Sequence, residues 1–330
     1  MRPLAVAVIG VGHLGQHHAR IYSTLPGVHL AAVVDTNPAR AAWVAERYGG
    51  QPVTDFAAVL SHVDAVSVAV PTSVHYPITK ACLEAGLHVL VEKPIASTVD
   101  QAEELVALAA RMQRVLHVGH IERFNPIIEK IRPYVTEPRF IECHRLSPFQ
   151  PRGTDVDVVR DLMIHDLDMI LSFRPGPLRD LRAVGLTVLS SHLDIVNTRM
   201  EFASGCVANL TASRVSTGRL RKLRVFQSAS YCTVDYQTRD AVIQQRMGES
   251  SNGAISSVVT HHLRGTNEEP LSRELSAFIE AIRGKSALGV SGEEAVAALK
   301  LAQQVLDAIA SGPAADASSS RWPSCPSPGL

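Results

Sequence analysis

The chain has 330 residues, 46% hydrophobic and 19% charged, which is typical of a globular protein long enough for two domains. Lysine plus arginine and aspartate plus glutamate both number 32, so no bulk charge favours nucleic acid or an anionic membrane as a partner. The five cysteines form no CxxC pair, which argues against a disulfide framework and a structural zinc. No apolar run approaches the ~20 residues of a membrane span, and we expect a cytoplasmic protein. The segment MRPLAVAVIGVG is predicted to be a buried strand, since it lacks a signal-peptide cleavage pattern.

Residues 1–121 are predicted to form a doubly wound α/β domain. Strands that are apolar on both faces and separated by helices indicate a parallel sheet covered on both sides. The predicted strands are LAVAVIG, HLAAVVD, AVSVAVP, HVLVE and VLHVG, and the predicted helices lie near 14–25, 38–48, 74–86 and 98–112.

A glycine-rich turn follows the first predicted strand. In VAVIGVGHLGQHHAR, Gly10, Gly12 and Gly15 form a GxGxxG pattern between a strand and a helix, where backbone can approach a pyrophosphate. Asp35 ends the second strand, where it would accept hydrogen bonds from ribose hydroxyls and repel a 2′-phosphate. We therefore expect NAD rather than NADP. Arg40 is the one observation in favour of NADP, because a nearby arginine can accommodate a 2′-phosphate. The alternative is an aspartate that only caps the next helix.

Two further strand ends carry residues suited to a cofactor site. HVLVEKPIA ends a buried strand with Glu92 and Lys93, and VPTSVH ends another, and ligands of such sheets bind at the carboxyl ends of the strands. A surface ion pair is the alternative for Lys93. The predicted cofactor-binding residues are Gly10, Gly12, His13, Leu14, Gly15, Asp35, Pro71, Thr72, His75, Glu92 and Lys93.

Residues 122–310 are predicted to form a second, α+β domain. IVNTRMEF alternates polar and apolar residues, and Ser204 and Gly205 turn it into CVANLTAS, which indicates a hairpin in a one-sided antiparallel sheet. Its polar face could line a substrate cavity or a subunit interface. Further strands are expected around 221–228, 230–236 and 240–247, and helices near 156–172, 271–284 and 292–310. The last helix could pack back on the first domain, and the Ser- and Pro-rich tail, 311–330, is predicted to be disordered.

The helix DLMIHDLDMIL carries Asp161, His165 and Asp168 on one face at helical spacing. His165 could accept the hydroxyl proton when a secondary alcohol is oxidised, Asp161 could hold its ring, and Lys93 could stabilise the alkoxide. The pattern does not decide between His165 and Lys93 as the proton acceptor, and we name His165. The alternative is an Asp–His pair that only fastens the helix. We expect no metal, because the segment lacks an EF-hand glycine and an HExxH motif.

The motifs GVGHLG, VEKP, GHIERFNP and DLMIHDLD, in this order, resemble the glucose–fructose oxidoreductase/inositol dehydrogenase (Gfo/Idh/MocA) family over residues 1 to about 310. The resemblance implies a Rossmann domain followed by an open, largely antiparallel sheet through which subunits assemble, as a homodimer or homotetramer. It also implies that Lys93, Asp161 and His165 are catalytic. The predicted substrate-binding residues are Arg123, Asn125, Arg160 and Asp168.

The segment SRVSTGRLRKLRVF contains a cluster of cations that suits a solvated edge, an interface or a phosphate-bearing substrate. Its members are Arg214, Arg219, Arg221, Lys222 and Arg224, and other phosphate candidates are Arg123, Arg152 and Arg160. This segment and DVDVVRDLMIHDLDMIL resemble family members that oxidise the 3-hydroxyl of UDP-N-acetylglucosamine for an amino sugar of lipid A. Two alternatives stay open: a dehydrogenase of a free sugar or inositol, and a non-catalytic NAD-sensing regulator.

Overall fold

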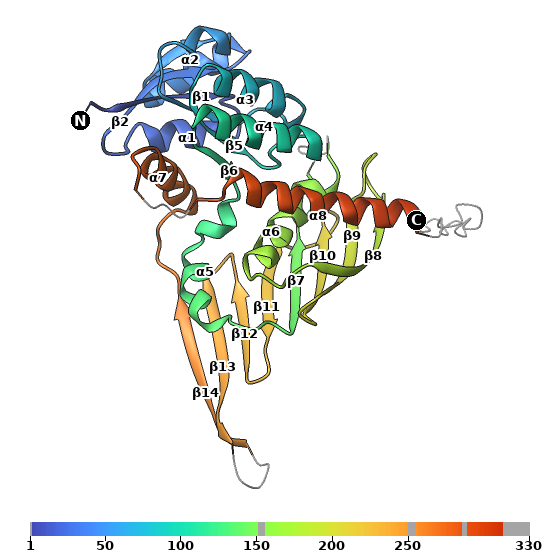
Figure 1. The fold of residues 1–330 in the computed structure, drawn as a ribbon. Helices are drawn as coiled ribbons and strands as arrows, with labels where there is room; N and C mark the ends of the chain where they lie inside the picture. Colours follow the sequence, from blue (N-terminus) through green and yellow to red (C-terminus); the bar gives the residue numbers. More distant parts are fainter. Residues whose placement is uncertain (1, 151–155, 250–254, 286–288, 313–330) are drawn as a thin grey trace, which may run out of the picture.

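The computed structural model describes residues 2–150, 156–249, 255–285 and 289–312. Figure 1 shows two stacked domains with two helices running between them. Among these residues, no helix combines the length and apolar character that crossing a membrane requires. The predicted tail lies outside the described residues from 313 onward.

Within the described residues, the first domain contains a six-stranded parallel sheet in the order β3-β2-β1-β4-β5-β6. Its strands are β1 Leu4–Ile9, β2 Val28–Val34, β3 Gln51–Val53, β4 Ala65–Val68, β5 His88–Glu92 and β6 Leu116–Gly119. Its helices are α1 Gly15–Tyr22, α2 Pro38–Tyr48, α3 His75–Glu84 and α4 Val99–Met112. Every residue of β4 is buried because helices cover both faces of the sheet. The predicted doubly wound domain is confirmed, and only the three-residue β3 was not predicted.

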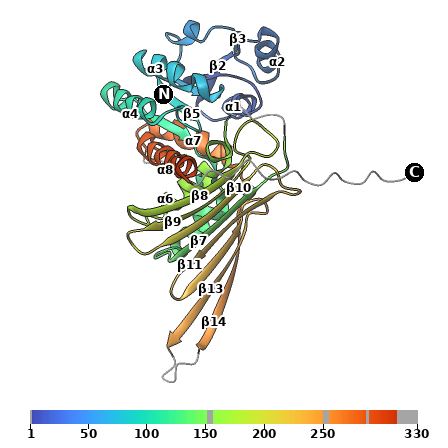
Figure 2. The same ribbon diagram turned by 90° about the vertical axis from the view of Figure 1, so that its right-hand side faces the viewer.

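The described part of the second domain contains an eight-stranded sheet in the order β14-β13-β12-β11-β7-β10-β9-β8. Its strands are β7 Phe140–Leu146, β8 Leu178–Leu186, β9 Ile195–Phe202, β10 Val207–Ser213, β11 Leu220–Phe226, β12 Ser230–Asp235, β13 Asp240–Glu249 and β14 Ile255–Arg264. Only β7 and β10 pair in parallel, and β9 and β10 form the predicted hairpin. The largely antiparallel sheet is confirmed, although β7, β8 and β14 were not predicted. Figure 2 shows the strands fanning out below the first domain.

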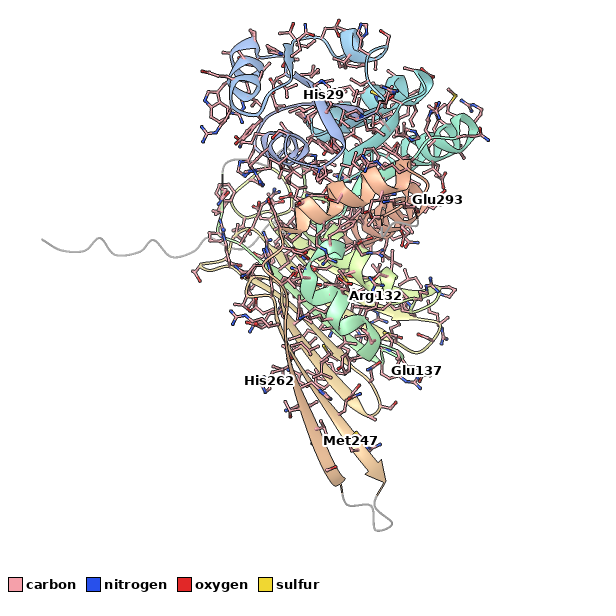
Figure 3. All side chains as sticks on the ribbon, turned by 90° about the vertical axis from the view of Figure 1, so that its left-hand side faces the viewer. His29, Arg132, Glu137, Met247, His262 and Glu293 are labelled. Atoms are coloured by element: carbon pink, nitrogen blue, oxygen red, sulfur yellow. The ribbon has the colours of Figure 1, made fainter. Side chains whose placement is uncertain are left out.

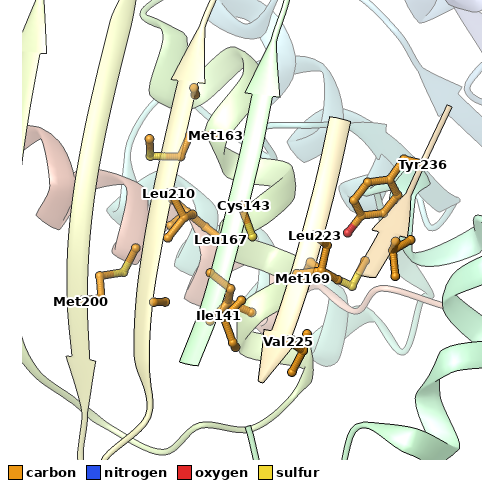
Figure 4. Packing of buried hydrophobic residues seen from close by; sticks show 14 of the residues in the cluster. Ile141, Cys143, Met163, Leu167, Met169, Met200, Leu210, Leu223, Val225 and Tyr236 are labelled. Carbon is orange, nitrogen blue, oxygen red and sulfur yellow. The ribbon is translucent and has the colours of Figure 1, made fainter. Parts of the chain in front are cut away.

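One face of this sheet is covered and the other is open. Buried residues of the strands, such as Ile141, Leu210 and Leu223, pack against Met163 and Leu167 from the helical side (Figure 4). The covering helices are α6, Ile164–Ser172, and α8, Gly292–Ser311, while the short α5 spans Pro126–Ile131. Figure 3 shows β13 and β14, with Met247 and His262, projecting away from the first domain, in which His29 lies.

The last two helices complete the first domain as well as the second. Helix α7, Pro270–Ile282, places Leu275 and Phe278 in the same buried cluster as Tyr22 of α1. Helix α8 contributes Leu299 of its first half to the core of the first domain and Val305 of its second half to the core of the second. The last helix therefore packs on both domains and fixes how they face each other.

The predicted continuous helix over 156–172 is wrong in one detail. Residues Val159–Met163 form a π-helical turn, and the α-helix α6 begins only at Ile164. A π-turn is wider than an α-turn, so it changes which side chains share a face, and such turns are frequent at functional sites.

Candidate active site

The glycine turn has the shape that a dinucleotide requires. Gly10 has φ +84°, and a Cβ there would lie 2.7 Å from the carbonyl oxygen of Ala69. A Cβ at Gly15 would lie 1.8 Å from the carbonyl oxygen of Gly10, whereas a Cβ at Gly12 would meet no atom within 4 Å. Two glycines thus allow the close turn, and the third leaves open space in front of α1. The N–H groups of Gln16 and His17 at the start of α1 donate to the carbonyl oxygens of Gly12 at 3.4 Å and Leu14 at 2.8 Å, so the positive end of the helix dipole is what favours a phosphate in this space.

Asp35 lies in a cavity of about 680 Å³ that Gly10, Gly12 and Pro71 also line. Its Oδ2 accepts from the N–H of Val11 at 3.1 Å and its Oδ1 from the N–H of Asn37 at 3.0 Å, which fixes the carboxylate at the end of β2. A carboxylate has lone pairs beyond these two, and they can accept from ribose hydroxyls. The cavity and the turn together fit the adenosine and pyrophosphate of a dinucleotide.

The two alternatives for this region have different outcomes. Asn37, not Asp35, caps α2, accepting from the N–H groups of the first turn at 3.0 and 3.2 Å, so the capping interpretation of Asp35 is wrong. Arg40 donates to the carbonyl oxygens of Val11 at 2.7 Å and of Gly12 at 3.0 Å, and its guanidinium stacks on Trp43. Arg40 therefore braces the glycine turn itself.

Lys93 is where the two domains meet. It follows β5, and its Nζ donates to the carbonyl oxygen of Asp161 at 2.6 Å and to Oδ1 of Asp161 at 3.1 Å. The side chain of Lys93 is only 15% exposed, so this contact replaces most of its hydration. The ammonium from the first domain thus lies against the π-turn of the second, and the surface-pair alternative for Lys93 is wrong.

The role expected for Asp161 needs correction. Its carboxylate is held by Lys93, while Nδ1 of His165 is buried and has no hydrogen-bond partner in the described part of the chain. The π-turn explains this, because it begins the α-helix after Asp161 and so breaks the i, i+4 relation with His165. Burial and the nearby charges of Lys93 and Arg145 hold the pKa of His165 well below its ordinary value. His165 is therefore a neutral imidazole at neutral pH.

Asp168 does not open onto a substrate cavity, contrary to the prediction. It is 1% exposed, and Arg123 grips its carboxylate with Nε at 2.7 Å and Nη2 at 2.8 Å. His120, which sequence reasoning did not single out, lies between this pair and His165, with its Nδ1 3.9 Å from Asp168 and its ring centroid 6.2 Å from that of His165. Burial lowers the pKa of His120, and neither ring nitrogen has a partner among the described residues.

The other predicted substrate contacts are engaged within the protein. Asn125 caps α5, and its Nδ2 donates to the carbonyl oxygen of Tyr236 at 3.2 Å. Arg160 donates to Asp157 at 3.0 Å and to Gln303 at 2.8 Å. The geometry gives Asn125 and Arg160 structural roles and does not support contact with a substrate.

Two of the predicted cofactor residues support the loop that carries Lys93 and do not face the cofactor cavity. His75 is buried, with its ring nitrogens 2.7 Å from the carbonyl oxygen of Pro94 and 2.9 Å from that of Val70. Glu92 is 2.8–3.1 Å from the position a Cβ would take at Gly119, so only glycine leaves it room there. Of the remaining predictions, His13 and Leu14 are exposed on the turn and Thr72 is half-buried.

Sequence reasoning also missed a buried polar network below this site. His18 of α1 joins Ser67 of β4 at 2.7 Å and Glu92 of β5 at 3.0 Å. Glu274 of α7 is 2% exposed, and its carboxylate oxygens have no partner among the described residues. Burial and the neighbouring Glu92 raise the pKa of Glu274 well above its ordinary value, which favours its neutral form. The only sequence signal was the polarity of these residues within apolar elements.

A second buried network lies below α6. Arg145 of β7 donates to both carboxylate oxygens of Asp166, at 3.0 and 2.9 Å, and to Glu122 at 2.8 Å. All three side chains are at most 9% exposed. The described residues contain no group of three or more histidine, cysteine, aspartate or glutamate side chains placed to hold a metal ion.

Comparisons with known proteins agree with this geometry. The family model described as "Oxidoreductase family, NAD-binding Rossmann fold" matches residues 4–120. UDP-N-acetylglucosamine 3-dehydrogenase of Acidithiobacillus ferrooxidans is 36% identical over 299 residues, which cover 89% of this chain and 95% of that protein. Inositol 2-dehydrogenase of Rhizobium meliloti is 26% identical over 320 residues, 92% of this chain and 96% of that enzyme.

Solved structures extend the similarity to the whole fold. A structure of the Acidithiobacillus ferrooxidans enzyme superposes with a TM-score of 0.87 at 35% identity, covering 94% of this chain and 98% of the other. Scyllo-inositol dehydrogenase from Lactobacillus casei shares the fold at a TM-score of 0.77 and 20% identity, covering 94% and 97% of the two chains. Both domains therefore follow an architecture that known oxidoreductases use.

Proposed function

Because this chain belongs to the Gfo/Idh/MocA family of oxidoreductases and carries its NAD-binding Rossmann fold, we propose that it is an NAD-dependent dehydrogenase that oxidises the 3-hydroxyl of UDP-N-acetylglucosamine. The 36% identity to an enzyme named for that reaction supports this substrate, and the lower identity, 26%, to inositol 2-dehydrogenase of Rhizobium meliloti makes inositol the second choice. A regulator that only senses NAD would not need the lysine, aspartate and histidine at the domain junction.

The contact between Lys93 and Asp161 is the observation on which the proposed chemistry depends. It brings an ammonium from the end of β5 to the helix that carries His165, at the carboxyl edge of the parallel sheet. Ligands of open α/β sheets bind at that edge. The glycine turn and Asp35 lie at the same edge, so a dinucleotide held there would extend toward Lys93.

We assign the proton to His165 and the stabilisation of charge to Lys93. His165 is neutral at neutral pH, and because its Nδ1 is buried, Nε2 is the ring nitrogen that can take the proton of the substrate hydroxyl. Bound NAD supplies the acceptor for the hydride that leaves the carbon. Lys93 is a hydrogen-bond donor beside His165 and can stabilise the developing alkoxide, while Asp161 keeps the ammonium in place.

The open face of the eight-stranded sheet is the proposed surface for assembly into a homodimer or homotetramer. It presents the ring of Phe226, stacked on Tyr231 with centroids 4.7 Å apart and tilted against Phe140 at 5.5 Å, and Arg224 paired with Glu142 at 2.9 Å. An apolar patch rimmed by polar residues is typical of a protein interface. Sedimentation equilibrium of the purified protein would measure the assembly, and a monomer would contradict it.

The proposal also includes a place in metabolism. A 3-keto nucleotide sugar is the substrate that an aminotransferase needs to make a diamino sugar, the kind of sugar used for lipid A. NAD and nucleotide sugars are cytoplasmic metabolites, so the reaction belongs in the cytoplasm.

A substrate screen tests the proposed function. NADH formation would be followed by absorbance with UDP-N-acetylglucosamine, UDP-glucose, myo-inositol and free hexoses, each at the same concentration. We expect a much larger kcat/KM for UDP-N-acetylglucosamine than for the others. Reaction with inositol or unphosphorylated sugars alone would overturn the proposed substrate and favour the second choice.

A further inference from the structure

Half of the eight cations that the sequence offered for a phosphate-bearing substrate are neutralised by carboxylates of the protein. Four arginines lie in short ion pairs: Arg123 with Asp168 at 2.7 Å, Arg160 with Asp157 at 3.0 Å, Arg214 with Asp194 at 2.9 Å and Arg224 with Glu142 at 2.9 Å. Arg152 lies outside the described residues. Three cations of the segment, Arg219, Arg221 and Lys222, have no such short pair within the described ranges, and Lys222 lies on the open side of β11.

Arg221 lies beside the buried guanidinium of Arg145, which forms ion pairs with the nearby carboxylates. In the pairing of β11 with β7, Arg221 is directly opposite Arg145, and both lie on the helix-covered side of the sheet. Arg145 holds Glu122 at 2.8 Å and Asp166 at 2.9 Å. Arg221 is left with a contact of 3.8 Å to Glu122, and its side chain is 44% exposed. Its guanidinium is therefore open to solvent and weakly compensated.

Arg219 adds to this positive charge. It lies immediately before β11, two residues from Arg221 in the chain, and its charge acts on the Arg221 guanidinium. Burial and the charges of Arg145 and Arg219 lower the pKa of Arg221. Arg221 in turn makes the smallest of the named contributions to the low pKa of His165, after burial, Lys93, Arg145 and His120. Like charges kept together beside a catalytic group indicate that a bound anion completes the site.

We propose that Arg221, assisted by Arg219, binds the diphosphate of a nucleotide-sugar substrate, an inference that rests on the proposed function. The diphosphate is attached to C1 of the sugar, and only C2 separates C1 from the reacting C3. A cation for the diphosphate must therefore lie close to His165, and Arg221 is directly opposite Arg145, which holds Asp166, the residue next to His165. A guanidinium can donate to two phosphate oxygens at once, which selects diphosphate over a neutral hydroxyl.

Substitution of Arg221 tests the inference, with the next residue as a control. Arg221→Gln removes the charge, and Arg221→Lys keeps the charge but loses the paired N–H donors of the guanidinium. Lys222→Gln makes the same charge change on the opposite, open side of β11. For each variant and the wild type one would measure kcat and KM for UDP-N-acetylglucosamine, KM for NAD, the Kd of UDP and of inorganic pyrophosphate by calorimetry, and Tm.

We expect R221Q to raise KM for the nucleotide sugar and Kd for UDP about ten- to a hundredfold, since hydrogen bonds to charged groups are lost. R221K should have a smaller effect, and K222Q none, with KM for NAD unchanged throughout. If R221Q unfolds, R221K alone still decides, because its Kd for UDP must exceed that of K222Q.

The inference and the proposed function fail in different ways. Wild type that oxidises UDP-N-acetylglucosamine while R221Q and R221K bind UDP as K222Q does would overturn the diphosphate site alone. Wild type that is inert toward the nucleotide sugar would overturn the proposed function. In that case, pyrophosphate binding lost in R221Q would support the anion site, and binding unaffected by it would overturn both.

Discussion

Two regions face each other at the domain junction. We call the glycine turn, Asp35 and Lys93 the first rim, and the π-turn and α6 with His165 the second rim. The two rims are built by different means. The first uses backbone groups: Gly10 and Gly15 shape the turn, and Asp35 is held by backbone N–H groups of the loops beside it. The second uses ion pairs between side chains, such as Arg145 with Asp166. A backbone site tolerates side-chain changes around it, whereas a site built on buried ion pairs depends on each partner.

The two rims meet at Lys93 and Asp161, which are 68 residues apart in sequence. Neither rim is complete alone, because the first supplies the cofactor turn and the ammonium, and the second supplies His165. Variants that change turnover without changing NAD affinity, or the reverse, therefore test whether the first rim binds the cofactor and the second rim carries the proton acceptor.

The largest effect is expected where the two rims meet, at His165 and Lys93. His165→Ala should lower kcat/KM by about 10²–10⁴-fold, because a positioned general base is lost. Lys93→Ala should also abolish turnover, and the Kd of NAD should stay within a few-fold of wild type in both variants. Stopped-flow kinetics and fluorescence titration with NADH would measure these quantities, with His62→Ala as an exposed-histidine control. A large loss of NAD binding in His165→Ala would contradict the division of roles.

The buried ion pairs should control the stability of the second rim. Arg145→Met leaves Asp166 and Glu122 buried without their counterion, and we expect it to lower the free energy of unfolding by about 3–5 kcal/mol. The control is Asp180→Ala, which removes an exposed pair with Arg182 and should cost at most about 1 kcal/mol. Urea unfolding would compare them. Equal effects would show that the Arg145 network does not stabilise the domain.

A smaller but sharper contrast is expected at the first rim. Gly15→Ala forces a Cβ against the carbonyl oxygen of Gly10 and should cost about 1–3 kcal/mol of stability, with loss of NAD binding. Gly12→Ala meets no protein atom, so Tm should hardly change, while the methyl group occupies the space for the phosphates and weakens NAD binding. Thermal unfolding and NADH titration distinguish them. A stability loss in Gly12→Ala equal to that in Gly15→Ala would refute this assignment.

The fold was predictable where the hydrophobic pattern is continuous. The strands of the first domain are apolar on both faces and stand out from their helices, and the alternation in β9 is unmistakable. Strand β7 alternates as well, but Glu142, His144 and Arg145 interrupt its apolar character. Strand β8 lies at the sheet edge with several exposed residues, and so it gives little signal.

The site was predictable in its members more than in its contacts. Lys93 and His165 were singled out because their residue types suit the chemistry, and Asp35 because it follows a strand at the right distance from the glycine turn; their roles stay predictions. The partner of Asp161 was missed because a π-turn is not visible in helical spacing. The roles of Asp168 and Glu92 were missed because Arg123 and His18 reach them across 45 and 74 residues.

The pKa of His165, measured by NMR titration in the wild type and in Lys93→Met, tests most directly whether the two rims converge. The account predicts a pKa below the ordinary 6.5 in the wild type and a higher pKa in the variant, because the ammonium of Lys93 opposes protonation of the ring. Equal values in the two proteins, or a wild-type pKa at or above 6.5, would show that Lys93 does not act on His165 and would contradict the account.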